Sequence, residues 1–294
     1  MNPLNKISIT IAGILIEVHS PLSAAGLGIE NRMGAFFTGT DNPVARVSLR
    51  WEESTGSPSP RGELIYNPGS VWRMYRSGDM VYAAINYLDD GTDANTISVL
   101  RANSSWDDLT LTERRTGSHW RSLINFGAGE LILRTKIILT GGLVFHSSGI
   151  DDNGRGIVFV GHSEAGKSTQ SRLWGRLPGV IEMNDDRMAV RPHASGGAEC
   201  FGTPWGGTAG LAKNHQAPLS ALILLEKACT NKIERLSPSV SASMLLARSF
   251  LPYWDKSLMS RAVNNLSLLL ESVPVYRLCC RPEPEIVSLV RSVL

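Results

Sequence analysis

The chain of 294 residues is 43% hydrophobic and 19% charged, and it carries a formal net charge of +2. This composition is typical of a globular protein with one large or two small cores, and it excludes intrinsic disorder. The small net charge, without a strongly basic or acidic tail, does not indicate a surface for nucleic acids or membranes, which relies on clustered Lys and Arg.

The first part of the chain alternates short apolar runs with turn residues. The expected strands are ISITIAGILIEV, ARVSLRW, GELIYN, MVYAAINYL and TISVLRA, and their separators are rich in Gly, Pro, Asn, Asp and Ser. The alternating, β-branched first run favours a strand over a signal peptide. We therefore expect a β-rich N-terminal module over residues 1–115, whose role the sequence does not indicate.

The rest of the chain mixes helical and extended patterns. HWRSLINFGAGELILRTKIILT predicts a helix over 119–140. Strands are expected at GLVFHSSGI, IVFV, GVIEM, RMAVRP, ALILLEK and VYRLCC, and helices at SASMLLARSF, KSLMSRAVNNLSLLLESV and PEIVSLVRSVL. Residues 116–294 thus predict a second domain of the α/β class.

The segment GHSEAGKS, residues 161–168, matches the P-loop (Walker A) pattern GxxxxGK[ST] and lies between an expected strand and an expected helix. Its glycines let backbone N–H groups approach phosphate oxygens, and the start of the helix adds its unpaired N–H groups. Lys167 would neutralise the β- and γ-phosphates and Ser168 would bind Mg²⁺, so ATP and Mg²⁺ are the expected cofactors. The predicted nucleotide-binding residues are Gly161, His162, Ser163, Glu164, Ala165, Gly166, Lys167, Ser168 and Thr169.

A pair of carboxylates, Asp185 and Asp186, follows the strand GVIEM one short helix after this motif. Adjacent side chains on an extended backbone point in different directions, so one aspartate can bind Mg²⁺ while the other accepts a proton from a substrate hydroxyl. The alternative is an exposed turn pair that closes a hairpin.

Together, FHSSGIDDNGRGIVFVGHSEAGKST and NDDR resemble the catalytic domain of the HPr kinase/phosphorylase family, which shares the phosphoenolpyruvate carboxykinase-type nucleotide fold. The resemblance covers residues 142–192 well and the rest of the C-terminal half loosely. It implies a mixed sheet, with His146 beside the catalytic aspartate, Asp185 as base and Asp186 assisting the metal. Which aspartate has which role stays open.

Three features depart from the family pattern. The family's arginine-rich signature is replaced by GTPWGGTAGLAKNHQAP, so HPr is not the expected substrate. His162 and Glu164 stand where small residues are common in the family's loop. GTPWGG predicts either a mobile cover or a tight turn held by a buried tryptophan, and Glu199 either corresponds to a family glutamate or is a solvated loop residue.

The leading hypothesis is an ATP-dependent kinase that transfers the γ-phosphoryl group to a hydroxyl, with serine in a peptide or protein as the expected acceptor. The alternatives are a kinase for an amino acid or a sugar, and a nucleotide-dependent binding or regulatory protein with little turnover. The resembled family includes hexamers, so a homo-oligomer is kept open.

The four cysteines, at positions 200, 229, 279 and 280, form no CxxC pair and have no His partner at metal-ligand spacing. We expect buried or half-buried free thiols and a reducing compartment, hence a cytoplasmic location.

Overall fold

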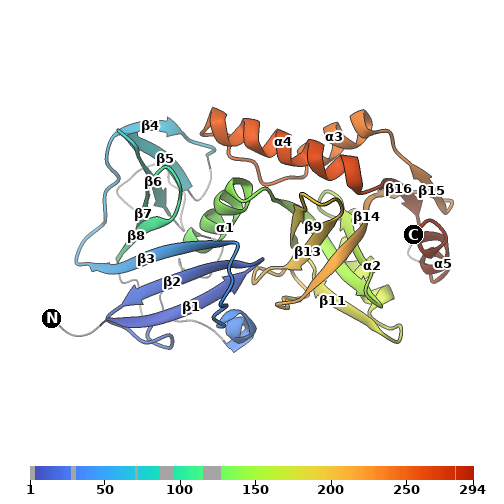
Figure 1. Cartoon of the computed structure of the whole chain (residues 1–294), viewed down its shortest axis with the longest axis horizontal. Helices are drawn as coiled ribbons and strands as arrows, with labels where there is room; N and C mark the ends of the chain where they lie inside the picture. Colours follow the sequence, from blue (N-terminus) through green and yellow to red (C-terminus); the bar gives the residue numbers. More distant parts are fainter. Residues whose placement is uncertain (1–3, 28–30, 70–71, 87–95, 115–126, 282) are drawn as a thin grey trace. The chain divides into compact units, whose positions relative to one another are not determined.

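The computed structural model describes residues 4–27, 31–69, 72–86, 96–114, 127–281 and 283–294. The chain forms two compact units (Figure 1). The first contains residues 1–140 and 252–256, and the second contains residues 141–251 and 257–294. The first unit therefore extends beyond residue 115, where the sequence predicted the end of the N-terminal module.

The first unit contains an eight-stranded sheet with the strand order β1-β2-β3-β8-β7-β6-β5-β4. Pairs β2–β3 and β3–β8 are parallel, and the other neighbours are antiparallel. The strands are β1 Asn5–Ile11, β2 Ile14–Ser20, β3 Ala45–Ser54, β4 Glu63–Tyr66, β5 Trp72–Ser77, β6 Met80–Ile85, β7 Ser98–Ala102 and β8 Asp108–Arg114.

The sequence-based prediction of this sheet is right in class and incomplete in detail. The expected first strand is a hairpin, because Ala12 and Gly13 both have positive φ values, of 50° and 73°, and form a two-residue turn between β1 and β2. Strands β5 and β8 were missed because Arg, Thr and Glu interrupt their apolar patterns. Two of these polar residues, Arg73 of β5 and Glu113 of β8, are themselves buried, which an apolar pattern does not indicate.

Two helical elements accompany this sheet, η1 Asn31–Phe36 and α1 Ala128–Leu139. Helix α1 packs against β2 and buries Leu131, Ile132 and Ile137. The helix predicted over 119–140 is present from Ala128, and the part before residue 127 lies outside the described residues.

The second unit is a mixed sheet with the order β10-β9-β12-β13-β14-β16-β15, and β11 pairs with β9. The path closes on itself because β10 also pairs in parallel with β14. The strands are β9 Leu143–Asp152, β10 Gly156–Val160, β11 Val180–Asn184, β12 Arg187–Pro192, β13 Ala198–Gly202, β14 Gln216–Lys227, β15 Lys232–Arg235 and β16 Val275–Cys280. The six strands predicted here are present, whereas β13 and β15 were not predicted.

Four helices flank this sheet, α2 Lys167–Trp174, α3 Pro238–Leu246, α4 Lys256–Ser272 and α5 Glu285–Arg291. Helix α4 lies above β9 and β13 in the view of Figure 1. Phe159, Trp174, Ile223, Leu278 and Ile286 belong to one buried cluster that joins β10, β14 and β16 to α2 and α5. This cluster holds the start of α2 beside the end of β10, which positions the segment between them.

The mixed sheets and few helices bear out the expected α/β class. Among the described helices, none combines the length and the apolar character that crossing a bilayer requires.

Candidate functional site

Residues 161–166 form a tight loop between β10 and α2, so the strand and helix expected on either side of the GxxxxGK[ST] motif are both present. We call residues 161–169 the lysine loop. Gly166 is the N-cap of α2 and has a φ of 104°, a left-handed conformation that glycine adopts without strain. A Cβ at Gly161 would lie 2.7 Å from the Cβ of Ala165, so the first glycine is required for close packing.

The lysine loop has an exposed rim and a buried base. His162, Ser163, Glu164 and Thr169 are exposed, Gly166 and Ser168 are half-buried, and Gly161, Ala165 and Lys167 are buried. Glu164 has a φ of 66°, unusual for a residue with a side chain. The Glu164 side chain is exposed, so its negative charge stays in water. It therefore repels an anion at the loop less than a buried carboxylate would.

The ammonium group of Lys167 is held inside the loop. Its Nζ donates hydrogen bonds to the carbonyl oxygens of Gly161 at 3.0 Å and His162 at 2.9 Å. Burial, together with the nearby charge of Arg248, lowers the pKa of Lys167 to about 8. The two carbonyl oxygens offset only part of the cost of burying the charged ammonium group. An anion bound at this loop would therefore stabilise the charged form of Lys167.

Asp185 is buried and its carboxylate accepts three backbone hydrogen bonds. Oδ1 accepts from the N–H groups of Gly207 at 2.7 Å and Leu211 at 3.2 Å, and Oδ2 accepts from Ala209 at 2.9 Å. A Cβ at Gly207 would lie 3.1 Å from Asp185 Oδ2. The side chain therefore fixes the segment 206–211, and its oxygens already accept protein N–H groups.

Asp186 points elsewhere, as expected for adjacent residues. Its Oδ1 lies 3.0 Å from His146 Nε2, and its Oδ2 is paired with Arg187. Burial lowers the pKa of His146 to about 4, and the charges of Lys167 and Arg187 contribute. The imidazole is therefore neutral at pH 7 and donates its Nε2–H to the carboxylate. The aspartate beside His146 is Asp186, not Asp185.

The residue before the pair, Asn184, orders this turn and was not singled out from the sequence. Its Oδ1 accepts the N–H groups of Asp186 and Arg187, both at 2.7 Å. Its Nδ2 donates to the carbonyl oxygens of Thr203 at 2.8 Å and Trp205 at 3.2 Å. An asparagine that follows an apolar strand and precedes two aspartates was the available signal, because such side chains commonly bond nearby backbone.

A cavity of about 450 Å³ joins the lysine loop to the histidine. We call it the histidine pocket, and it is lined by His146, His162, Ser163, Ala247, Arg248, Ser249 and Phe250. The segment after α3 reaches this place through a β-bridge between Phe145 and Ser249, and the N–H of His146 donates to the carbonyl oxygen of Arg248 at 2.8 Å. No local sequence signal identified Arg248, because only this long-range pairing brings it to the site.

A second cavity of about 340 Å³ lies on another side of the loop. We call it the glutamine pocket, and it is lined by Glu164, Ala165, Gly166, Thr169, Gln170, Lys227, Ala228, Cys280 and Arg281. The lysine loop thus contributes to two cavities: His162 and Ser163 line one, and Glu164, Ala165, Gly166 and Thr169 line the other.

The other candidate residues from the sequence contact neighbouring groups of the protein. Trp205 is buried, and Asp185 binds Gly207, so GTPWGG forms an anchored segment rather than a free cover. His215 Nε2 lies 2.9 Å from Asp151 Oδ2, and Glu199 Oε2 lies 3.6 Å from His193 Nε2. Glu199 lies half-buried on strand β13, so the prediction of a solvated loop residue is wrong.

The cysteines are free thiols as predicted, but Cys229 is exposed rather than buried. Burial raises the pKa of Cys200 to about 12, so this thiol is not a nucleophile at neutral pH. Within the described ranges, no three His, Cys, Asp or Glu side chains gather as a metal site.

Comparisons with known proteins add little to this geometry. No family model matches the chain, and no curated protein matches it. One solved structure that it is similar to is the Hpr(Ser) kinase/phosphatase from Coxiella burnetii, at 14% sequence identity and a TM-score of 0.30, covering 51% of this chain and 95% of that chain. This likeness is too slight to carry a fold or a function over to the present chain.

Proposed function

We propose that this chain is an ATP-dependent kinase that transfers the γ-phosphoryl group of ATP to a hydroxyl. The observation that carries the proposal is the histidine pocket, where the rim of the lysine loop and His146, the partner of Asp186, line one cavity. Phosphoryl transfer needs a phosphate cradle with a lysine, and a carboxylate near the acceptor. Lys167 and Asp186 are not lining residues themselves, but each contacts one: Lys167 Nζ donates to the carbonyl oxygen of His162, and Asp186 Oδ1 lies 3.0 Å from His146 Nε2.

The lysine loop is the proposed phosphate site. The backbone of residues 161–166 and the start of α2 would supply N–H donors, and Lys167 would supply a positive charge close to the phosphates. We keep Gly161, His162, Ser163, Glu164, Ala165, Gly166, Lys167, Ser168 and Thr169 as the proposed nucleotide-binding residues.

The proposed magnesium ligands are Ser168, which is half-buried on the first turn of α2, and Asp186. Hydroxyl and carboxylate oxygens suit this ion, and a nucleotide-bound Mg²⁺ commonly uses only one or two protein ligands beside phosphates and water. When bound, it would neutralise charge on the transferred phosphoryl group. Two oxygen ligands are compatible with the absence of a three-residue cluster among the described side chains.

Of the aspartate pair, we assign the chemistry to Asp186 and a scaffold role to Asp185. Asp185 is saturated by three backbone N–H groups, whereas Asp186 is oriented by His146 and Arg187. The neutral imidazole donates a hydrogen bond that orients the carboxylate, and each carboxylate oxygen keeps a further lone pair for a proton or a metal ion. Asp186 then either accepts the hydroxyl proton or binds the metal, and dependence on Mg²⁺ concentration separates these roles.

The proposed acceptor is a serine of a peptide or protein, and a free amino acid or sugar is the alternative. We measure transfer from [γ-³²P]ATP to serine-containing peptides, free serine and sugars, and locate the phosphate by mass spectrometry. The Lys167→Ala variant tests the loop, and Lys232→Ala is its matched control, since Lys232 is 69% exposed on β15.

The proposal predicts labelling by the wild type and by Lys232→Ala, and loss of labelling in Lys167→Ala. Labelling that is unaffected by Lys167→Ala would contradict it. ATP binding through Lys167 without labelling of any acceptor would instead favour a nucleotide-dependent binding protein. A cytoplasmic location and a homo-oligomer stay predictions that these experiments do not address.

A further inference from the structure

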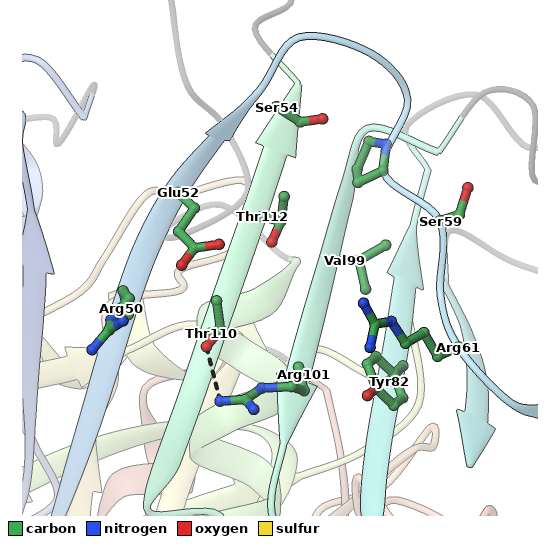
Figure 2. A pocket seen from close by; sticks show the side chains of 11 residues that line it. Arg50, Glu52, Ser54, Ser59, Arg61, Tyr82, Val99, Arg101, Thr110 and Thr112 are labelled. Carbon is green, nitrogen blue, oxygen red and sulfur yellow. Dashed lines mark hydrogen bonds between the residues drawn. The ribbon is translucent and has the colours of Figure 1, made fainter. Parts of the chain in front are cut away.

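A polar groove lies on one face of the sheet of the first unit, and no residue of the lysine loop lines it. It has a volume of about 480 Å³, and Figure 2 shows the side chains that surround it. We call it the arginine groove. It is lined by Arg50, Glu52, Ser54, Pro58, Ser59, Arg61, Tyr82, Val99, Arg101, Thr110 and Thr112.

The floor of the groove is set by strand register. Arg50 pairs with Thr110, Thr110 with Arg101, and Arg101 with Tyr82, so one row of side chains crosses β3, β8, β7 and β6. Glu52 and Thr112 begin a second row, two residues further along. Because neighbouring strands lie about 4.8 Å apart, the first row spans roughly 14 Å.

The opposite face of the same strands is core. Leu49, Trp51, Leu100, Leu109 and Leu111 are buried there and alternate with the groove residues. Any ordinary amphipathic sheet would have polar residues on its second face. The groove differs from that simple case because a wall closes one side of it.

The wall is the segment between β3 and β4, which contributes Pro58, Ser59 and Arg61 (Figure 2). It is tied down by a hydrogen bond from Arg114 Nη1 to Ser57 Oγ at 2.7 Å. At its other end, Gly62 has a φ of 95°, and a Cβ there would lie 1.9 Å from the carbonyl oxygen of Arg76. The wall is therefore held in place before any ligand arrives.

Among the described residues, only one of the three arginines that line the groove has a partner. Arg101 donates to Thr110 Oγ1 at 3.0 Å and lies 3.7 Å from Asp108. Arg50 and Arg61 have no hydrogen-bond or ion-pair partner within the described ranges of the chain. Two free guanidinium groups, one on the floor and one on the wall, are suited to carboxylates, which they bind in a bidentate manner.

We propose that the arginine groove binds an acidic peptide segment in an extended conformation. The guanidinium groups would bind its carboxylates, and the hydroxyls of Ser59, Thr110 and Thr112 would bond its backbone amides. Glu52 lies two residues from Arg50 on the same face and would repel a dense polyanion such as nucleic acid, but it can accept peptide N–H groups. The choice of a peptide rests on the proposed function, since a docked peptide would supply the acceptor.

The probe is a fluorescein-labelled octapeptide with three glutamates and two serines, compared by fluorescence anisotropy with its counterpart in which glutamine replaces each glutamate. We expect the acidic peptide to bind at least tenfold more tightly. Arg50→Gln and Arg61→Gln should each weaken binding about fivefold to tenfold. The matched control is Arg46→Gln, which removes the same charge from an exposed position of β3 outside the groove and should change the dissociation constant less than twofold.

Equal binding of the two peptides, or equal effects of the three substitutions, would overturn the proposal. Free glutamate or citrate competing at the same concentration as the peptide would also overturn it, in favour of a small-anion site. Titrating the acidic peptide against Lys167→Ala without ATP separates the two proposals. If the peptide binds but no phosphate is transferred in the assay above, only the kinase proposal fails. If phosphate is transferred but the peptide does not bind, only the groove proposal fails.

Discussion

The charged groups of the proposed kinase site and those of the arginine groove are held in different ways. Lys167, Asp185 and Asp186 are bound by backbone groups or by neighbouring side chains. Arg50 and Arg61 project from a strand and from a wall without a partner in the described part of the chain. The first arrangement fixes groups in place for chemistry, and the second leaves charge available for recognition.

The largest effect is expected from a substitution in the aspartate pair. In Asp186→Asn, the amide no longer accepts a proton or binds a metal as a carboxylate does, so we expect turnover to fall about a hundredfold or more. Nucleotide affinity, measured by isothermal titration calorimetry, should change less than threefold. If Asp186 binds the metal, raising the Mg²⁺ concentration will restore part of the rate. Undiminished turnover would remove Asp186 from the chemistry.

The neighbouring substitution, Asp185→Asn, should act on stability. Its amide cannot accept the three N–H groups that the buried carboxylate binds, so we expect a loss of about 3 kcal/mol in the free energy of unfolding. Urea denaturation measures this loss, and Asp186→Asn serves as the matched control with less than about 1 kcal/mol. Equal losses in both variants would contradict the division of roles.

A buried aspartate of the second unit, paired with two partly exposed arginines, gives a pH-dependent effect. Asp152 is fully buried and binds Arg291 at 2.7 and 2.9 Å and Arg155 at 2.8 Å. Burial would raise the pKa of Asp152, but hydrogen bonds from Arg291 and Asn153 and the two arginine charges outweigh it, so the pKa is lowered.

Because the folded pKa lies below the unfolded value of about 3.9, this carboxylate contributes stability above that pH and loses it as the pH falls further. Asp152→Asn should therefore lower the free energy of unfolding by about 2 kcal/mol at pH 7. Urea titrations at several pH values should show the difference from wild type shrinking below about pH 4. A difference independent of pH would contradict the ion-pair explanation.

The smallest effect is expected in the groove. The Arg61 side chain has no hydrogen bond or ion pair within the described part of the chain. Arg61→Gln should therefore change the free energy of unfolding by less than about 0.5 kcal/mol. Thermal unfolding checks this, with Arg101→Gln as the comparison, because Arg101 donates to Thr110. A large loss in Arg61→Gln would show that the guanidinium supports the wall rather than a ligand.

Local sequence patterns predicted six of the eight described strands of the second unit, because those strands are apolar runs bounded by turn residues, whereas the short strands β13 and β15 were missed. The lysine loop was found because its residues are consecutive. The partner of His146, the scaffold role of Asp185 and the presence of Arg248 depend on pairings between distant segments, such as Phe145 with Ser249. The arginine groove was missed for the same reason, since its row of side chains comes from four strands.

The most direct test of the account is ATP binding to the lysine loop, measured by calorimetry in the presence of Mg²⁺. The wild type and Lys232→Ala should bind with the same affinity, and Lys167→Ala should bind at least tenfold more weakly. Equal ATP affinity in Lys167→Ala, or no binding to the wild type, would contradict the claim that this loop holds a nucleotide.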